Sequence, residues 1–177
     1  QTCALPILVL RMILDNPGRP FYFARTSGGY GHELGLGPYL VAQGLARKLV
    51  DRPVVGGRDT ILVAGEGWVD VRRTRELWEI FEGPSALIRK NGWPDRASIG
   101  IPALYVSTAF MLADALASTG DRAGAGRVLA QARDLARATR IDRWFDFGQL
   151  LETHYDSADT NPLPDVRRDT GGPRSGR

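Results

Sequence analysis

His32 and Glu33 form the adjacent pair best suited to chemistry, because an imidazole and a carboxylate can bind a metal ion or transfer a proton. A metal site needs about three protein ligands, and the other histidine, His154, lies far along the chain. Two histidines without spaced partners define no Ser/His/Asp triad. We therefore assign no catalytic, cofactor-binding or metal-ligating residue, and name Tyr30, His32, Glu33 and Trp93 as a candidate interaction surface.

The pair lies in a glycine-rich segment, residues 27–37, which follows an apolar stretch and so resembles a nucleotide-binding loop. The dinucleotide pattern fails, because Gly29 and Gly31 require a third glycine at the position that Leu34 occupies. No Gly-Lys-Ser/Thr follows to make a phosphate-binding P-loop. We interpret the segment as a flexible surface loop, in which glycine permits left-handed backbone angles.

The four tryptophans could stack on a sugar or anchor the core, and at their spacing we favour core anchors. They are Trp68, Trp78, Trp93 and Trp144.

Composition narrows the classes of function. The chain of 177 residues is long enough for one domain with a core. Its net charge is +3, but the arginines are scattered among acids and form no basic stripe, which argues against nucleic acid as a partner. No apolar run reaches about 18 residues, so we expect no membrane span. The one cysteine, Cys3, excludes an internal disulfide.

The first half of the chain predicts short elements. Leu8–Asn16 is typical of a helix that stops at Pro17-Gly18. Val41, Leu45 and Leu49 have helical spacing interrupted by Gly44, yet residues 45–50 could equally be a strand. The remaining elements predicted in this half are strands at 21–24 and 60–64 and a turn region at 51–58.

The second half predicts helices. Asp70 is a candidate N-cap for a helix with Leu77, Trp78 and Phe81 on its apolar face, broken at Gly83-Pro84 and followed by a turn at 91–94. Helices are then expected at about 102–118 and 122–138, separated by Gly120-Asp121, and at about 141–154 with Trp144, Leu151 and Tyr155 on one side.

The two helices within 102–138 resemble one tetratricopeptide repeat in residue type and spacing. The matching positions are Ala109, Leu112, Ala113, Leu116, Ala125, Leu129 and Ala132, with Arg137 where the repeat often has proline. Small residues allow the helices to approach closely, and leucines fill the gaps. One copy is too few for a stable array, so we favour a structural hairpin over a peptide-binding groove.

The expected fold class is therefore α+β and mainly helical. A small α/β segment at 8–67 precedes a helical part at 68–155, which contains the tetratricopeptide-like antiparallel hairpin and a capping helix. Residues 156–177, rich in Pro, Gly, Asp and Arg, are expected to form a disordered tail. Residues 1–7 resemble a translated sequencing adapter and are expected to be a non-native scar on a truncated reading frame, the alternative being a genuine N-terminal coil.

Three segments carry a family resemblance: residues 16–26 (NPGRPFYFART), 36–40 (LGPYL) and 43–50 (QGLARKLV). Together they resemble the C-terminal region of bacterial multi-span membrane proteins similar to protein O-mannosyltransferases, filed as glycosyltransferase family 117. The resemblance covers about residues 8–145. The predicted helical hairpin also fits it.

The resemblance implies a parent enzyme in the bacterial inner membrane that uses a polyprenyl-phosphate sugar donor. This soluble domain would lie on the extracytoplasmic side, without cofactor or metal. Its partners would be the membrane-embedded rest of its own chain and a protein acceptor. The family's catalytic residues lie in the absent membrane part, so we expect a non-catalytic accessory domain. The alternatives are a tetratricopeptide-like interaction module and a small enzyme acting through His32 and Glu33.

Overall fold

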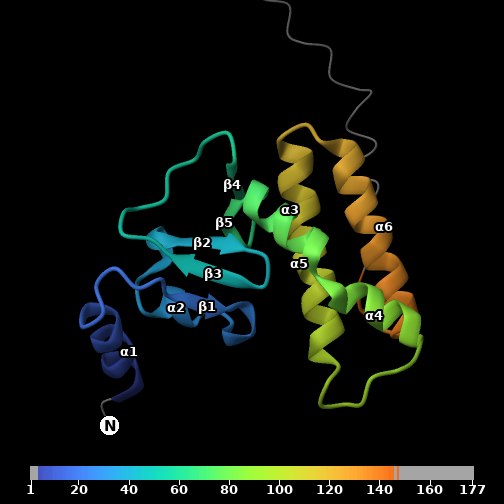
Figure 1. Cartoon of the computed structure of the whole chain (residues 1–177), viewed down its shortest axis with the longest axis horizontal. Coiled ribbons are helices and arrows are strands. Elements are labelled where there is room, and N and C mark those ends of the chain that lie inside the picture. The colour runs from blue at the N-terminus through green and yellow to red at the C-terminus, as the bar shows by residue number, and fades with distance from the viewer. Residues whose placement is uncertain (1–3, 146, 148–177) are drawn as a thin grey trace, which may run out of the picture. The chain divides into compact units, whose positions relative to one another are not determined.

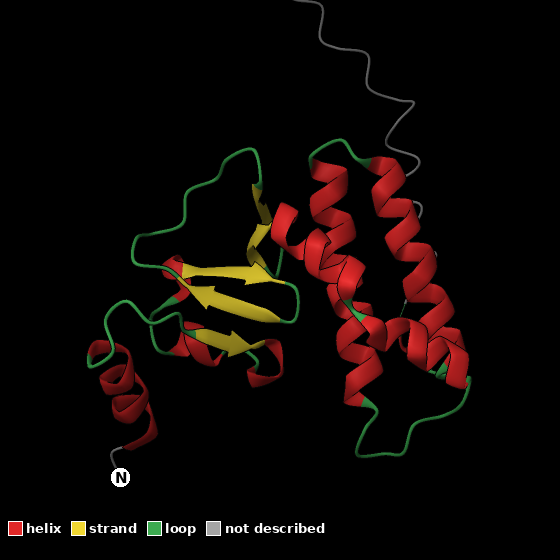
Figure 2. Cartoon of the chain, in the orientation of Figure 1, coloured by secondary structure: helices red, strands yellow, loops and turns green. Residues whose placement is uncertain are grey.

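A five-stranded sheet in the first half of the chain is followed by four consecutive helices (Figures 1 and 2). The computed structural model describes residues 4–145 and Phe147. The strands are β1 (Tyr22–Ala24), β2 (Leu40–Gln43), β3 (Ala46–Leu49), β4 (Thr60–Val63) and β5 (Gly67–Asp70). The helices are α1 (Ala4–Leu14), α2 (Tyr30–Glu33), α3 (Val71–Ile80), α4 (Glu82–Lys90), α5 (Gly100–Ser118) and α6 (Arg122–Ala138). Single 3-10 turns are η1 (Arg25–Ser27), η2 (Gly37–Tyr39) and η3 (Asp142–Trp144). The α+β class is confirmed.

The sheet has the strand order β1-β3-β2-β5-β4, in which the β2–β5 pair is parallel and the other pairs are antiparallel. Gly44 has φ 61° in the two-residue turn between β2 and β3, a backbone angle that glycine adopts without steric cost. The strand alternative for residues 45–50 is therefore right. The helical spacing of Val41, Leu45 and Leu49 was misleading, because the turn reverses the chain between them.

The helical part begins later than predicted, because residues 67–70 form β5. Gly65 and Gly67 both have positive φ, so the chain turns sharply and returns antiparallel to β4. Four residues with one buried apolar side chain, Val69, carry too little alternation to identify a strand from sequence.

Helix α3 starts where predicted, since the Asp70 side chain accepts a hydrogen bond from the Arg73 N–H at 2.9 Å. The break comes earlier than Gly83-Pro84. Phe81 is extended (ψ 114°), and Pro84 lies in the first turn of α4, where a backbone N–H has no helical partner to lose. Asn91, in the left-handed conformation (φ 45°), ends α4 at the predicted turn.

Helices α5 and α6 are joined by a three-residue turn and lie side by side (Figure 1). All seven positions that carried the repeat resemblance are buried. Gly120 turns the chain at φ 89°, and Asp121 caps α6. Of the helix expected at 141–154, the structure describes residues 141–145 and Phe147, and Asp142–Trp144 form the 3-10 turn η3. Leu151, Tyr155 and the expected tail lie outside the described residues.

Helix α5 corrects the expectation that no segment has the length and composition of a membrane span. Its 19 residues are long and apolar enough to meet that test. Half of its apolar window is buried within the chain, where Leu112 and Leu116 pack with α6. A core helix has the same composition, so this property does not distinguish the two environments.

Candidate functional site

The glycine-rich segment is more ordered than predicted, because residues 30–33 form α2 and its base is packed on the sheet. Gly31 is buried, and a Cβ there would lie 2.8 Å from Leu40 Cδ1 and 3.5 Å from Phe23 Cγ. Glycine at this position therefore lets α2 approach β1 and β2 closely. The interpretation as a flexible surface loop is wrong for this part of the segment.

His32 and Glu33 are both exposed on α2, as a solvated pair would be. The His32 ring lies against the chain at Gly37, where a Cβ would come within 2.8 Å of its Nδ1. Among the described residues no group of three or more His, Cys, Asp or Glu side chains could hold a metal ion. His154 lies outside the described residues.

Tyr30 differs from its two neighbours because it lines an apolar groove beside α1. The groove has a volume of about 300 Å³. Its walls come from α1, from β1 and the residue before it, and from the segment leading to α2: Val9, Met12, Ile13, Phe21, Tyr22, Phe23, Ala24, Ser27 and Tyr30. Only Ser27 and the two tyrosines bring polar side-chain atoms to this set.

The hydroxyl of Tyr30 is buried and has no hydrogen-bond partner among the described residues. Ser27 also lines the groove, and its hydroxyl donates to the Ala24 carbonyl at 2.6 Å. An unpaired buried hydroxyl costs roughly 1–3 kcal/mol, so native proteins rarely leave one unsatisfied without a reason.

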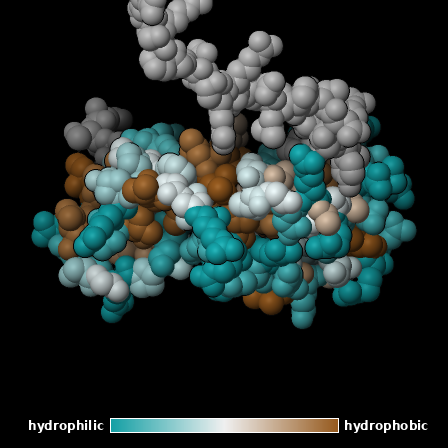
Figure 3. Space-filling view, turned by 90° about the horizontal axis from the view of Figure 1, so that it is seen from above, coloured by the Kyte–Doolittle hydropathy of each residue, from teal (hydrophilic) through white to brown (hydrophobic). Residues whose placement is uncertain are grey.

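Helix α1, which forms one wall of the groove, exposes six apolar side chains, while Val9 and Ile13 are half-buried along the groove and Arg11 is an exposed charge. The exposed members are Leu5, Ile7, Leu8, Leu10, Met12 and Leu14. The space-filling view shows hydrophobic residues reaching the surface among hydrophilic ones (Figure 3). Several large apolar side chains exposed together typically mark a surface that packs against protein or lipid.

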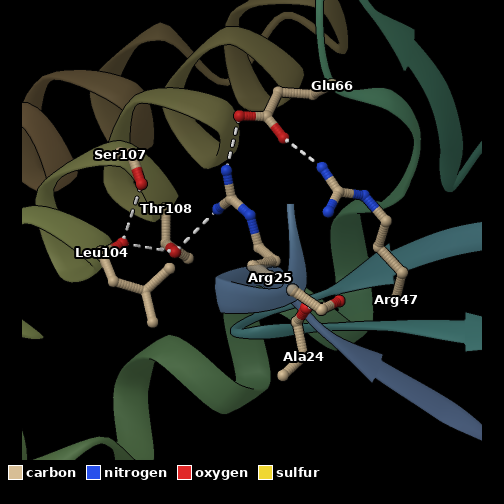
Figure 4. Close-up of polar contacts among 8 residues, drawn as sticks. Ala24, Arg25, Arg47, Glu66, Leu104, Ser107 and Thr108 are labelled. Carbon is tan, nitrogen blue, oxygen red and sulfur yellow. Dashed lines mark hydrogen bonds and ion pairs between the residues drawn. The ribbon is translucent and has the colours of Figure 1, made fainter. Parts of the chain in front are cut away.

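Apart from the groove, a network of hydrogen-bonded side chains lies between the sheet and α5 (Figure 4). Glu66, in the β4–β5 turn, accepts from Arg25 Nη2 at 2.5 Å and from Arg47 Nη2 at 3.1 Å. Arg25 Nη1 also donates to Thr108 Oγ1 on α5 at 2.7 Å, and that hydroxyl donates to the Leu104 carbonyl. We call Arg25, Arg47, Glu66 and Thr108 the arginine clamp.

Burial dominates the electrostatics of the clamp. The Arg25 side chain is only 5% exposed. Burial lowers the pKa of its guanidinium below the ordinary value, an effect that Glu66 opposes and Arg47 reinforces. Two cations share one carboxylate, and Arg25 also reaches Thr108 on α5. The geometry therefore favours a structural tie between β1 and α5 over a binding site.

The tryptophans divide between the two interpretations. Trp78 is a core anchor, 6% exposed, and its Nε1 donates to Gln131 Oε1 at 2.9 Å. Trp93 and Trp144 are about half exposed and meet edge to face, with ring centroids 6.3 Å apart. Trp93 thus contacts Trp144, whereas Tyr30 lines the groove beside α1.

A larger cavity, of about 440 Å³, opens where the loop before β4 and the start of α3 meet the α5–α6 turn. Arg58, Arg72 and Arg75 line it, together with Asp59 and Asp121. Arg75 is already paired with Asp121 at 2.9 Å, so the charges of this cavity partly neutralise one another.

Sequence reasoning missed both the clamp and the groove. Arg47 is an unusual residue for its place in the sheet, because its cross-strand neighbours, Phe23 and Ala42, are both apolar. A charge in an otherwise apolar row is the signal that could have pointed to the clamp. The groove residues Val9, Met12 and Ile13 gave only a helical pattern, and nothing in that pattern says which element they face.

We compared the chain with protein-family models, with curated proteins and with solved structures, and none of them matches it.

Proposed function

We propose that the chain is a non-catalytic accessory domain of a multi-span membrane glycosyltransferase similar to protein O-mannosyltransferases, attached to the membrane-embedded part through α1. The observation that carries the proposal is the exposure of six large apolar side chains along α1. Leu8, Leu10, Met12 and Leu14 all lie after residue 7, so the argument does not need the expected scar.

The arrangement of the segments that carry the family resemblance supports the same proposal. Residues 16–26 and 43–50 are far apart in sequence but contain β1 and β3, which pair from Tyr22↔Lys48 to Ala24↔Ala46. The segment at 36–40 leads into β2, which pairs with β3 on its other side. The resemblance thus falls on one continuous part of the sheet, directly after α1.

The native DNA upstream of codon 8 provides the test. Several apolar spans of about 20 residues in the same frame are expected. A start codon or a signal peptide close upstream would remove the membrane parent and the proposal with it.

The non-catalytic role is tested in the full-length parent expressed from that gene. His32→Ala and Glu33→Ala are expected to leave glycosyl transfer unchanged, because both side chains are exposed and neither belongs to a described metal site. Loss of transfer by either variant, at an unchanged amount of folded protein in the membrane, would make this domain part of the active site.

A tetratricopeptide-like interaction module is the second candidate, favoured by the fully buried small residues Ala113 and Ala132 between α5 and α6. Leu116 is 2% exposed, so a charge there would test folding and not binding. A peptide-library screen with Arg127→Glu, on the exposed side of α6, is the appropriate test. A tight peptide that this variant no longer binds would favour the module.

A further inference from the structure

Asn91 is followed directly by Gly92, a pair of residues that can react with each other without an enzyme. The backbone nitrogen after an asparagine can attack the side-chain carbonyl carbon and close a succinimide ring. Glycine hinders this attack least, because it has no Cβ. The other asparagines, Asn16 and Asn161, are each followed by proline, whose backbone nitrogen carries no hydrogen and cannot close the ring.

We propose that Asn91 is a site of spontaneous deamidation, which converts it to aspartate and isoaspartate in the folded chain. The Gly92 nitrogen loses its proton to water and forms a bond to Asn91 Cγ. The bond from Cγ to Nδ2 breaks, and the amide nitrogen takes up a proton and leaves as ammonia. Water then opens the succinimide at either carbonyl carbon, which leaves aspartate or isoaspartate.

Both reacting groups are free of other bonds. Asn91 is exposed, and its side chain forms no hydrogen bond with any other residue that the structure describes. The Gly92 N–H also donates to no acceptor within the described part of the chain. The bond that ends α4 uses a different group, because the Asn91 N–H donates to the Leu87 carbonyl at 3.1 Å.

The backbone at Asn91 offers little resistance to the rotation that ring closure requires. Asn91 has φ 45° and ψ 59°, the left-handed region that residues with a side chain disfavour, so a change of ψ leaves a strained conformation. The space at Gly92 is open, since a Cβ there would have only the Lys90 carbonyl oxygen near it, at 3.8 Å. Residues 91–99, all of them described, belong to no helix or strand.

Conversion changes the end of α4 and the surface beside it. Either product adds a negative charge where the helix presents its last carbonyl groups, an unfavourable place that Arg89 and Lys90 offset in part. Isoaspartate also adds one methylene to the main chain before Trp93, which contacts Trp144 with ring centroids 6.3 Å apart. We therefore expect isoaspartate to loosen the end of α4 and to alter the surface around Trp93, whatever the function of the domain.

Incubation of the purified chain in mildly alkaline buffer, followed by mass spectrometry, tests the inference. Cleavage after Arg89 and Arg96 releases residues 90–96, in which the gain of mass from amide to acid reports on Asn91. Chromatography separates the aspartate and isoaspartate forms, and isoaspartyl methyltransferase labels only the second. Asn16 is the control within the same molecule and should keep its amide, because Pro17 follows it.

Gly92→Ala tests the identity of the nucleophile. Gly92 does not have a positive φ and the added Cβ has room, so the variant should fold normally, as urea unfolding would show. The Cβ hinders the approach of the nitrogen to Cγ, and conversion should slow several-fold. Equal rates in the variant and the unchanged chain would overturn the inference, because the Gly92 nitrogen would then not be the attacking group.

The chain unfolded in urea provides the reference rate. The folded chain should convert at a rate within several-fold of that reference, since neither reacting group is held by another bond. Retention of the Asn91 amide in the folded chain, while the unfolded chain converts, would show that the end of α4 protects the site and would overturn the inference. Absence of conversion in both would overturn it equally.

Discussion

Thr108 should contribute more to stability than any hydroxyl that only bonds within its own helix. It is fully buried, and its Oγ1 accepts from Arg25 Nη1 at 2.7 Å. Thr108→Val keeps the shape and removes that acceptor, which leaves a charged donor unpaired in a side chain that is 5% exposed. Since an unsatisfied buried partner costs 1–3 kcal/mol and more when charged, we expect a loss of about 2–3 kcal/mol.

Thr139→Val is the matched control, because Thr139 is equally buried but makes only local bonds. Its Oγ1 donates to the Leu135 carbonyl at 2.7 Å, and that carbonyl also accepts from the Thr139 N–H. The substitution therefore leaves the carbonyl paired, and the expected loss is below about 1 kcal/mol.

Urea unfolding at neutral pH measures both variants, with equal slopes required for the comparison. The difference of about 1.5–2 kcal/mol corresponds to roughly 3–8 °C in Tm for a chain of this size. In an Arg25→Met background the cost of Thr108→Val should fall to the level of Thr139→Val, as a double-mutant cycle would show. If Thr108→Val and Thr139→Val cost the same within about 0.5 kcal/mol, the clamp is not a structural tie.

Three further predictions follow from single contacts. Asp121→Ala removes the cap of α6 and should cost about 1 kcal/mol at neutral pH. The Gly124 backbone N–H, which donates to this carboxylate, lowers the pKa of Asp121. The cap therefore stabilises the fold at pH values above 3.8, the ordinary pKa, and this stabilisation is lost as the pH falls through the lowered pKa. Urea unfolding curves at several pH values should show that the free-energy cost of Asp121→Ala shrinks in acid. Gly83→Ala places a Cβ against the phenol of Tyr105 and should cost roughly 1–3 kcal/mol in the same unfolding assay. Trp78→Phe removes the bond to Gln131 and should cost about 1–2 kcal/mol, with no further loss when Gln131→Leu is added.

Local signals predicted the helical half of the fold well. Asp70 as an N-cap, Gly120 at the turn and Asn91-Gly92 at the end of α4 each act through bonds within a few residues, so their effect is present in the sequence itself. At Gly44 the sequence indicated only an interruption of a helical pattern and not a hairpin turn. The strands on either side have four residues each, too few to show a clear strand periodicity.

The candidate site depended on long-range contacts that no local pattern contains. Arg25 meets Glu66 and Thr108, partners 41 and 83 residues away. Tyr30 belongs to the candidate surface named from the sequence, but its distinguishing feature is a buried hydroxyl, which depends on how α2 packs. Gly31 made that packing possible, and a glycine gives the same sequence signal in a flexible loop as at a close contact.

The two features missed from sequence meet at β1. Phe21 and Phe23 line the groove beside α1, and Arg25, directly after the strand, ties the same segment to α5 through Thr108. Arg25 therefore fixes the end of β1, the strand that carries the groove wall, to α5. Because β1 is an edge strand paired only with β3, the clamp supplies what pairing on its second side would otherwise provide. This argues that Arg25 holds the groove wall in place as well as joining sheet to helix.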